Sequence, residues 1–350
     1  MMGIRSLDCV RINWVPRPRK LGIGHGGLNA TGFALALLAL LIGSSAFGQQ
    51  LDPVTKWATD TSYQSTIHQN IIYQKAGSQN LRLDVIAQKS HSGARPVVIY
   101  FHGGGWVSGG KDGVLLKTLP YVARGMDAVN VEYRLASDAL APAAVEDCRC
   151  ALYWVVHHAK EYGFDTMKIV TTGESAGGHL ALMTGMLSPA EGFDNGCDQL
   201  PDAWQDQGPI AVRVAAIVNY FGPIDVFEFL QPSNGKKYAA AFPMPRNFAL
   251  RWFGDVPNRT ELARRLSPSS YVRKETPPII TVQGDLDPQV PYEHAVRFHQ
   301  ALDRSSIQNQ LVTIHGGHGA YSDHAWTTEQ NRQAQEAVFQ FLEKVGVLTP

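Results

Sequence analysis

The feature that most constrains this chain is the pentapeptide Gly-Glu-Ser-Ala-Gly at residues 173–177. It has the pattern G-x-S-x-G, in which a serine stands on a sharp turn between a strand and a helix. The context fits, because residues 168–172 have the composition of a short strand and residues 176–187 that of a helix. Glycines at both ends allow neighbouring backbone to pass close by, so we expect Ser175 in a strained conformation with its hydroxyl exposed. The pattern also arises by chance, since Gly and Ser are common, and it needs support from other stretches.

A second stretch, His102-Gly-Gly-Gly-Trp106, directly follows a continuous apolar run at 96–101 that predicts a strand buried on both faces. Acyl transfer passes through a tetrahedral oxyanion, and each backbone N–H group directed at it contributes roughly 3–4 kcal/mol. Glycines expose the main chain to a substrate. We therefore predict an oxyanion hole formed by the amides of Gly104, Gly105 and Ala176, with His102 bracing the loop rather than reacting.

The same loop contains an alternative motif, because residues 105–111 read G-x-x-x-x-G-K, most of a phosphate-binding loop. The next residue is Asp112, where Mg²⁺ binding requires Ser or Thr, and this defect disfavours a nucleotide site. The formal net charge of zero gives no reason to expect a nucleic-acid partner.

Two carboxylates compete for one role at the end of a strand predicted over 278–283. The segment 284–288 reads Gly-Asp-Leu-Asp-Pro, and an acid at this place can orient and stabilise a histidine. We prefer Asp287, with Asp285 as the alternative. Either side chain could instead cap the helix that follows.

Histidines follow the last predicted strand, at 310–314, in the sequence His315-Gly-Gly-His318-Gly. We predict His318 as the general base in preference to His315, because it lies deeper in the loop between glycines. A metal site formed by His315, His318 and His324 is the alternative, but no acid or cysteine ligand pattern accompanies them. We therefore predict no metal and no cofactor.

The order Ser175, Asp287, His318 places each residue after a predicted strand, and the agreement is more specific than any single motif. Strands alternating with helices predict an α/β fold with a mainly parallel sheet covered on both faces. A hairpin of strands at 71–73 and 81–87 would add antiparallel strands at one edge. We expect residues 49–70 to be a poorly ordered lead-in, residues 71–350 to form the domain, and residues 227–274 to form a small lid-like insertion.

The N-terminus has the layout of a secretory signal peptide at 1–48: basic residues, an apolar run at 33–42, then small residues before Gly48. The run is shorter than the ~20 residues of a membrane span. We predict cleavage after Gly48, export to the periplasm or the medium, and no membrane attachment afterwards; a later start or an uncleaved anchor are the alternatives. In an exported protein, Cys197 could pair with Cys148 or Cys150, which point to opposite sides of a predicted helix, or all three could be idle thiols.

Taken together, these stretches resemble the α/β-hydrolase fold, in the branch with an HGGG oxyanion motif. That branch includes hormone-sensitive-lipase-like esterases and bacterial feruloyl-esterase-like proteins. The similarity covers about residues 70–345 and extends to Val-Glu-Tyr-Arg-Leu at 131–135, Ala-Val-Glu-Asp at 144–147, Gly-Gly-His-Leu-Ala at 177–181 and Asn-Tyr-Phe-Gly-Pro-Ile-Asp at 219–225. The 49–70 segment is too short for the helical cap that the lipase-like esterases carry before their HGGG strand.

The resemblance implies a serine hydrolase acting on carboxylic esters, with Ser175 as nucleophile, His318 as base, Asp287 as acid, and Gly104 and Gly105 in the oxyanion hole. It makes small-molecule or polysaccharide-linked esters, acetyl or feruloyl, the expected substrates. Two alternatives stay open. The same triad serves amidases of the arylformamidase type, and a non-catalytic binding module can use the same fold.

Overall fold

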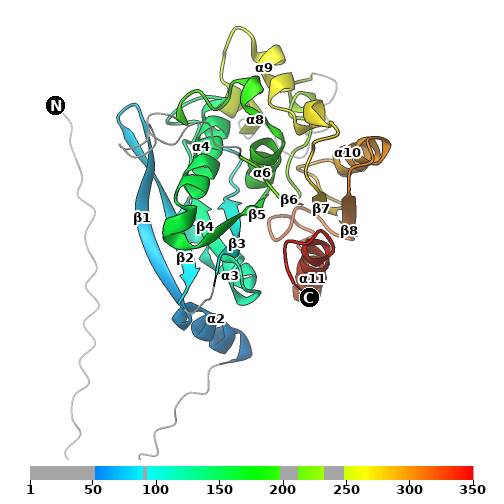
Figure 1. Cartoon of the computed structure of the whole chain (residues 1–350). Coiled ribbons are helices and arrows are strands. Elements are labelled where there is room, and N and C mark those ends of the chain that lie inside the picture. The colour runs from blue at the N-terminus through cyan, green and yellow to red at the C-terminus, as the bar shows by residue number, and fades with distance from the viewer. Residues whose placement is uncertain (1–51, 90–92, 198–211, 232–247, 350) are drawn as a thin grey trace, which may run out of the picture. The chain divides into compact units, whose positions relative to one another are not determined.

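The computed structural model describes residues 52–89, 93–197, 212–231 and 248–349 (Figure 1). The predicted signal peptide at 1–48 lies outside these residues. Within the described ranges, every helix is too short or too polar to span a bilayer.

The described part of the chain contains an eight-stranded sheet in the order β1-β2-β4-β3-β5-β6-β7-β8 (Figure 1). Strands β1 and β2 pair antiparallel, as do β2 and β4, and all later neighbours are parallel. This confirms the predicted mainly parallel sheet with an antiparallel hairpin at one edge. The strands are β1 (Ser65–Ala76), β2 (Gln79–Gln88), β3 (Arg95–Phe101), β4 (Asp127–Val131), β5 (Phe164–Glu174), β6 (Ala216–Tyr220), β7 (Ile279–Gly284) and β8 (Asn309–Ile314).

Helices cover both faces of the sheet. On one face lie α4 (Ala143–His157), α6 (Ala176–Met186) and α10 (Tyr292–Arg304), and on the other lie α3 (Leu115–Ala123) and α11 (Thr328–Lys344) (Figure 1). Strand β3 shows why the apolar run at 96–101 is continuous: Val97, Ile99 and Phe101 join the core on the first face, and Val98 joins the core on the second. Short helices complete the domain: η1 (Lys111–Gly113), α5 (Ala159–Tyr162) and η2 (Pro189–Glu191).

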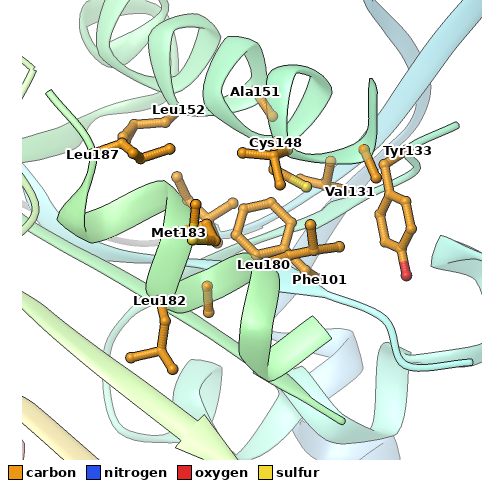
Figure 2. Close-up of a cluster of buried hydrophobic side chains, with 14 of the residues drawn as sticks. Phe101, Val131, Tyr133, Cys148, Ala151, Leu152, Leu180, Leu182, Met183 and Leu187 are labelled. Atoms are coloured by element: carbon orange, nitrogen blue, oxygen red, sulfur yellow. The ribbon is translucent and has the colours of Figure 1, made fainter. Parts of the chain in front are cut away.

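The core beneath the G-x-S-x-G helix holds that helix firmly in place. Figure 2 shows Phe101 of β3 packed among Cys148 of α4 and Leu180 and Met183 of α6. All four side chains are fully buried. Because protein interiors are close-packed, α6 cannot shift without opening voids, and the residue at its N-terminus is held accordingly.

The segment 49–70 differs from the prediction of a poorly ordered lead-in. Helix α2 spans Pro53–Tyr63, and β1 begins at Ser65, where it pairs with Gln88 at the far end of β2. The first residues of β1 are polar because most of them are exposed on an edge strand, so they lack the alternation that identifies a half-buried strand. Backbone pairing with β2, rather than an apolar pattern, orders the chain from Ser65 onward.

The described part of the 227–274 segment contains short helices: η4 (Glu228–Leu230), α8 (Phe248–Phe253), α9 (Arg259–Arg265) and η5 (Pro268–Tyr271). Residues 232–247 lie outside the described ranges. A disulfide joins Cys150 to Cys197, 47 positions apart, while Cys148 remains a buried thiol. The structure thereby selects one of the pairings that the sequence left open.

Candidate active site

Ser175 occupies the predicted strained turn between β5 and α6. Its backbone has φ 55° and ψ −121°, a conformation that is costly for a residue with a side chain, at about 1–3 kcal/mol. Gly173 and Gly177 make the turn possible, because a Cβ atom on either would lie 2.4 Å or 2.0 Å, respectively, from the Phe101 carbonyl oxygen. The backbone amide of Ser175 donates to the Tyr220 carbonyl of β6 at 2.9 Å, which ties the turn to the neighbouring strand.

Three side chains from distant parts of the sequence meet at this turn. The Ser175 hydroxyl lies 2.9 Å from Nε2 of His318, and Nδ1 of His318 lies 2.7 Å from a carboxylate oxygen of Asp287. The side chains of His318 and Asp287 are 2% and 0% exposed. With Nδ1–H donating to the carboxylate, Nε2 is left to accept the serine proton, which is the arrangement a general base requires.

The Asp287 carboxylate is held by three further contacts, not by His318 alone. One oxygen accepts from the backbone amides of Gln289 and Val290 at 2.8 and 3.0 Å, and the other accepts from Gln283 Nε2 at 2.9 Å. Gln283 also donates to the Val290 carbonyl at 3.1 Å. The sequence analysis placed Gln283 only as a strand residue. Its only sequence signal was a polar amide near the end of a largely apolar strand.

The alternative residues Asp285 and His315 form a separate pair. His315 Nδ1 lies 3.0 Å from Asp285, and its side chain is 79% exposed. This contact and a bond from the Gly316 amide lower the pKa of the Asp285 carboxyl. Neither residue contacts Ser175 or His318 in the hydrogen bonds of the described residues. Within those residues no three His, Cys, Asp or Glu side chains gather in a group suited to a metal ion.

The glycine loop after β3 has its main chain exposed toward Ser175. Gly104 and Gly105 have φ values of 118° and 61°, which glycine adopts without strain. A Cβ on Gly103 would lie 2.9 Å from the Glu174 carbonyl oxygen, so this loop passes directly beside the serine turn. Among the backbone hydrogen bonds of the described residues, none is donated by the amides of Gly104 or Gly105. Ala176 is the first residue of α6, where an amide has no acceptor within its own helix.

His102 lies inside the loop as a neutral brace. Its ring stacks on Tyr133 with a centroid separation of 4.1 Å, its Nδ1 donates to the Gly103 carbonyl at 2.8 Å, and the Tyr133 hydroxyl donates to its carbonyl at 2.7 Å. Burial lowers the pKa of His102 to about 4. The ring therefore carries no charge at neutral pH.

Lys111, the lysine of the alternative phosphate-loop motif, forms ion pairs with two carboxylates of this chain. Lys111 Nζ lies 3.0 Å from Asp84 of β2 and 2.7 Å from Asp112, with its side chain 5% exposed. It fastens the end of the glycine loop to the sheet. Asp112, which stands where the phosphate-loop motif requires Ser or Thr, is one of the two ion-pair partners of Lys111.

A pocket of about 390 Å³ opens over these groups, within the usual size range of ligand sites. Its lining includes Ser175, His318 and the loop glycines, together with Phe248 from α8. A polar group completes the rim: Lys117 lies 2.6 Å from Glu174, and the Tyr321 hydroxyl donates to Glu174 at 3.4 Å. The sequence analysis did not identify Phe248 or this polar group, because no motif marks them.

A mainly parallel sheet, a serine turn after its fifth strand, and an acid and a histidine after its last two strands define the α/β-hydrolase fold. The BD-FAE family model matches residues 83–302, more than half of the chain. The chain therefore belongs to the BD-FAE family.

Known relatives and neighbours agree with this fold. The esterase LipQ of Mycobacterium tuberculosis is 28% identical over 298 residues, which are 83% of this chain and 63% of LipQ. This chain thus spans less than two thirds of that relative. Est2, an esterase of Thermogutta terrifontis, superposes with a TM-score of 0.64 at 24% identity, over 82% of this chain and 96% of Est2. A bifunctional GH43-CE protein of Bacteroides eggerthii gives a TM-score of 0.63 at 23% identity, over 80% of this chain and 38% of that one.

Proposed function

We propose that this protein is a serine hydrolase that cleaves carboxylic esters through an acyl-enzyme on Ser175. The observation that carries the proposal is the continuous hydrogen-bonded chain from Ser175 through His318 to Asp287, of which Ser175 and His318 line an open pocket. The family and the esterase relatives support the same reaction class.

In the proposed mechanism, Nε2 of His318 accepts the hydroxyl proton as the Ser175 oxygen attacks the ester carbonyl carbon. Asp287 holds the imidazole in the tautomer that can accept this proton and stabilises the imidazolium that forms. The amides of Gly104, Gly105 and Ala176 donate to the oxyanion. The imidazolium then protonates the departing alcohol, and water clears the acyl-enzyme by the same route.

The strained backbone of Ser175 has a role in this scheme. A sharp turn directs the hydroxyl away from the strand and toward the open pocket, and it places the Ala176 amide beside the reacting carbon. The strain is tolerated because α6 is packed into the core below (Figure 2).

Ser175→Ala tests the proposal. We expect the variant to keep the thermal unfolding midpoint of the parent and to lose hydrolysis of p-nitrophenyl acetate by a factor on the order of 10⁴ or more. A fluorophosphonate probe should label the parent and leave the variant unlabelled. Hydrolysis that survives in the variant, or a parent that the probe fails to label, contradicts the assignment.

For the substrate, we propose acetyl or feruloyl esters linked to polysaccharides. The support is the family itself and the fold likeness to a protein described as a GH43-CE fusion. The polar rim of Lys117, Glu174 and Tyr321 offers donors and acceptors to a hydroxyl-rich alcohol. The test is a series of p-nitrophenyl esters of increasing chain length, methyl ferulate, acetylated xylan and an aryl formamide. A kcat/KM highest on the aryl formamide would favour an amidase instead.

A further inference from the structure

We propose that Trp252 of α8 is a positioning residue for the oxyanion hole: by stacking on Trp106 it holds the glycine loop in the conformation that directs the Gly104 and Gly105 amides at the reacting carbonyl. The inference rests on the proposed function, since it concerns the same site. It assigns a role to the insertion that goes beyond covering the pocket.

The glycine loop ends in a residue that is costly to hold in place. Trp106 has φ 60°, in the left-handed region, directly after Gly104 and Gly105, which also have positive φ. A bulky side chain is strained in this backbone conformation, which persists only where its surroundings over-determine it. If those surroundings are removed, the backbone of Trp106 is free to relax, and the two glycine amides before it move with it.

The insertion supplies the main restraint. The rings of Trp106 and Trp252 are stacked, with centroids 4.5 Å apart and planes 10° from parallel, and the two residues are 3% and 0% exposed. The Trp252 Nε1 atom is buried and has no hydrogen-bond partner in the described part of the chain. A donor left unpaired in the interior is a cost, so the contribution of Trp252 at this place comes from its flat ring and not from its N–H group.

A second restraint leads from the insertion to the same ring. Trp106 Nε1 donates to Nδ1 of His179 at 3.3 Å, and Nε2 of His179 donates to the Leu266 carbonyl at 2.7 Å. Only the neutral tautomer with its proton on Nε2 satisfies both bonds. Burial lowers the pKa of His179 to about 4, so this tautomer persists at neutral pH. His179 lies on α6, and its amide donates to the Ser175 carbonyl.

Helix α8 therefore reaches the oxyanion loop at two points. Trp252 stacks on the end of the loop, and Phe248, at the start of the same helix, lies so close to Gly105 that a Cβ there would be 2.5 Å from the Phe248 ring. The Trp252 carbonyl also accepts from the Ala141 amide at 2.9 Å, and the Trp106 carbonyl accepts from the Ala136 amide at 2.9 Å. Both tryptophans are thus fixed to the segment after β4.

Loss of the Trp252 ring should weaken stabilisation of the transition state more than binding of the substrate. Oxyanion donors act mainly on charge that develops during the reaction, so a misplaced donor lowers kcat with little change in KM. This separates a positioning role from a loss of pocket shape, which would raise KM.

The experiment compares Trp252→Leu with Trp252→Phe, and uses Trp154→Leu as the matched control. Trp154 of α4 is also buried, at 2% exposed, and stacks on His158, the residue after that helix, with centroids 4.1 Å apart. It lies outside the pocket lining. The measurements are kcat and KM on p-nitrophenyl acetate, the thermal midpoint, and the inhibition constant of an alkyl trifluoromethyl ketone. That ketone forms a hemiketal oxyanion on the serine and therefore reports on the oxyanion hole directly.

We expect Trp252→Leu to lower kcat by about 10- to 100-fold and to weaken ketone inhibition by a similar factor, with KM unchanged within about threefold. Trp252→Phe should recover most of both losses because it keeps a flat ring. Trp154→Leu should lower the thermal midpoint as much and leave kcat unchanged. Should Trp252→Leu fail to fold, Trp106→Phe, which keeps a ring but removes the donor to His179, is expected to show the same pattern more weakly.

The inference is overturned if Trp252→Leu keeps its kcat, if its loss is confined to KM, or if Trp154→Leu loses as much kcat. Failure of the proposed function looks different: the parent protein itself would hydrolyse no ester and would not react with the fluorophosphonate probe.

Discussion

Replacing Asp287 by Asn tests the site most sharply, because the change keeps the shape of the side chain while it removes the negative charge and alters the hydrogen bonding. Asp287 accepts from four donors, two on each oxygen: the Gln289 and Val290 amides on one, and His318 Nδ1 and Gln283 Nε2 on the other. Asn has a single oxygen, so its NH₂ group must face one of these pairs.

The structure determines which pair. Backbone amides cannot become acceptors, so the Asn oxygen turns to Gln289 and Val290. The NH₂ group then faces His318, which satisfies it by moving its own proton to Nε2. Gln283 can also adapt by turning its side-chain oxygen, which has no partner among the described groups, toward the new NH₂ group, at the cost of its bond to Val290. One hydrogen bond is lost, so the free energy of unfolding should fall by only about 1–2 kcal/mol.

Catalysis should fall far more. With the proton on Nε2, His318 cannot accept the Ser175 proton, and the wrong tautomer in a serine protease triad lowers kcat roughly 10⁴-fold. That factor corresponds to about 5 kcal/mol of lost transition-state stabilisation.

The matched control is Asp285→Asn, two residues away on the same loop. Asp285 contacts His315 and the Gly316 amide, so its loss should change kcat by less than about threefold. Both variants would be assayed on p-nitrophenyl acetate alongside denaturant unfolding. If Asp285→Asn lost as much activity as Asp287→Asn, or if Asp287→Asn kept more than a tenth of the parent kcat, the reasoning from these contacts would be refuted.

Further predictions concern stability. Burial lowers the pKa of both His102 and His179 from 6.5 to about 4, so between these values the unfolded chain binds more protons than the folded one. The free energy of unfolding should be highest above pH 6.5 and should fall by on the order of 3 kcal/mol per histidine as the pH drops from 6.5 to 4. The variant His179→Gln should show a smaller dependence of this free energy on pH, measured by urea unfolding at several pH values. An unchanged dependence in the variant would contradict the prediction. Reducing the Cys150–Cys197 bond, which closes a loop of 47 positions, should cost roughly 2–4 kcal/mol, whereas Cys148→Ala should leave the sensitivity to reductant unchanged.

Much of the fold could be predicted from the sequence, because the residues that determine it act locally. A parallel strand buried on both faces must be continuously apolar, as at 96–101, and a turn as sharp as that at Ser175 requires glycines on both sides. The prediction was weakest where local pattern is weakest. The lead-in at 49–70 was expected to be poorly ordered, yet α2 and the start of β1 lie there, because an exposed edge strand needs backbone pairing more than apolar side chains.

The candidate site also has features that the sequence predicts and features that only the folded structure decides. The succession of Ser175, Asp287 and His318 after their strands is a property of the amino-acid order, because the carboxyl ends of parallel strands meet at one edge of a sheet. The choice between Asp285 and Asp287, the pairing of Cys150 rather than Cys148, the support from Gln283, and the stack of Trp106 on Trp252 depend on side-chain directions across the fold. Residues so far apart in sequence are related only by packing, and packing is decided when the whole chain has folded.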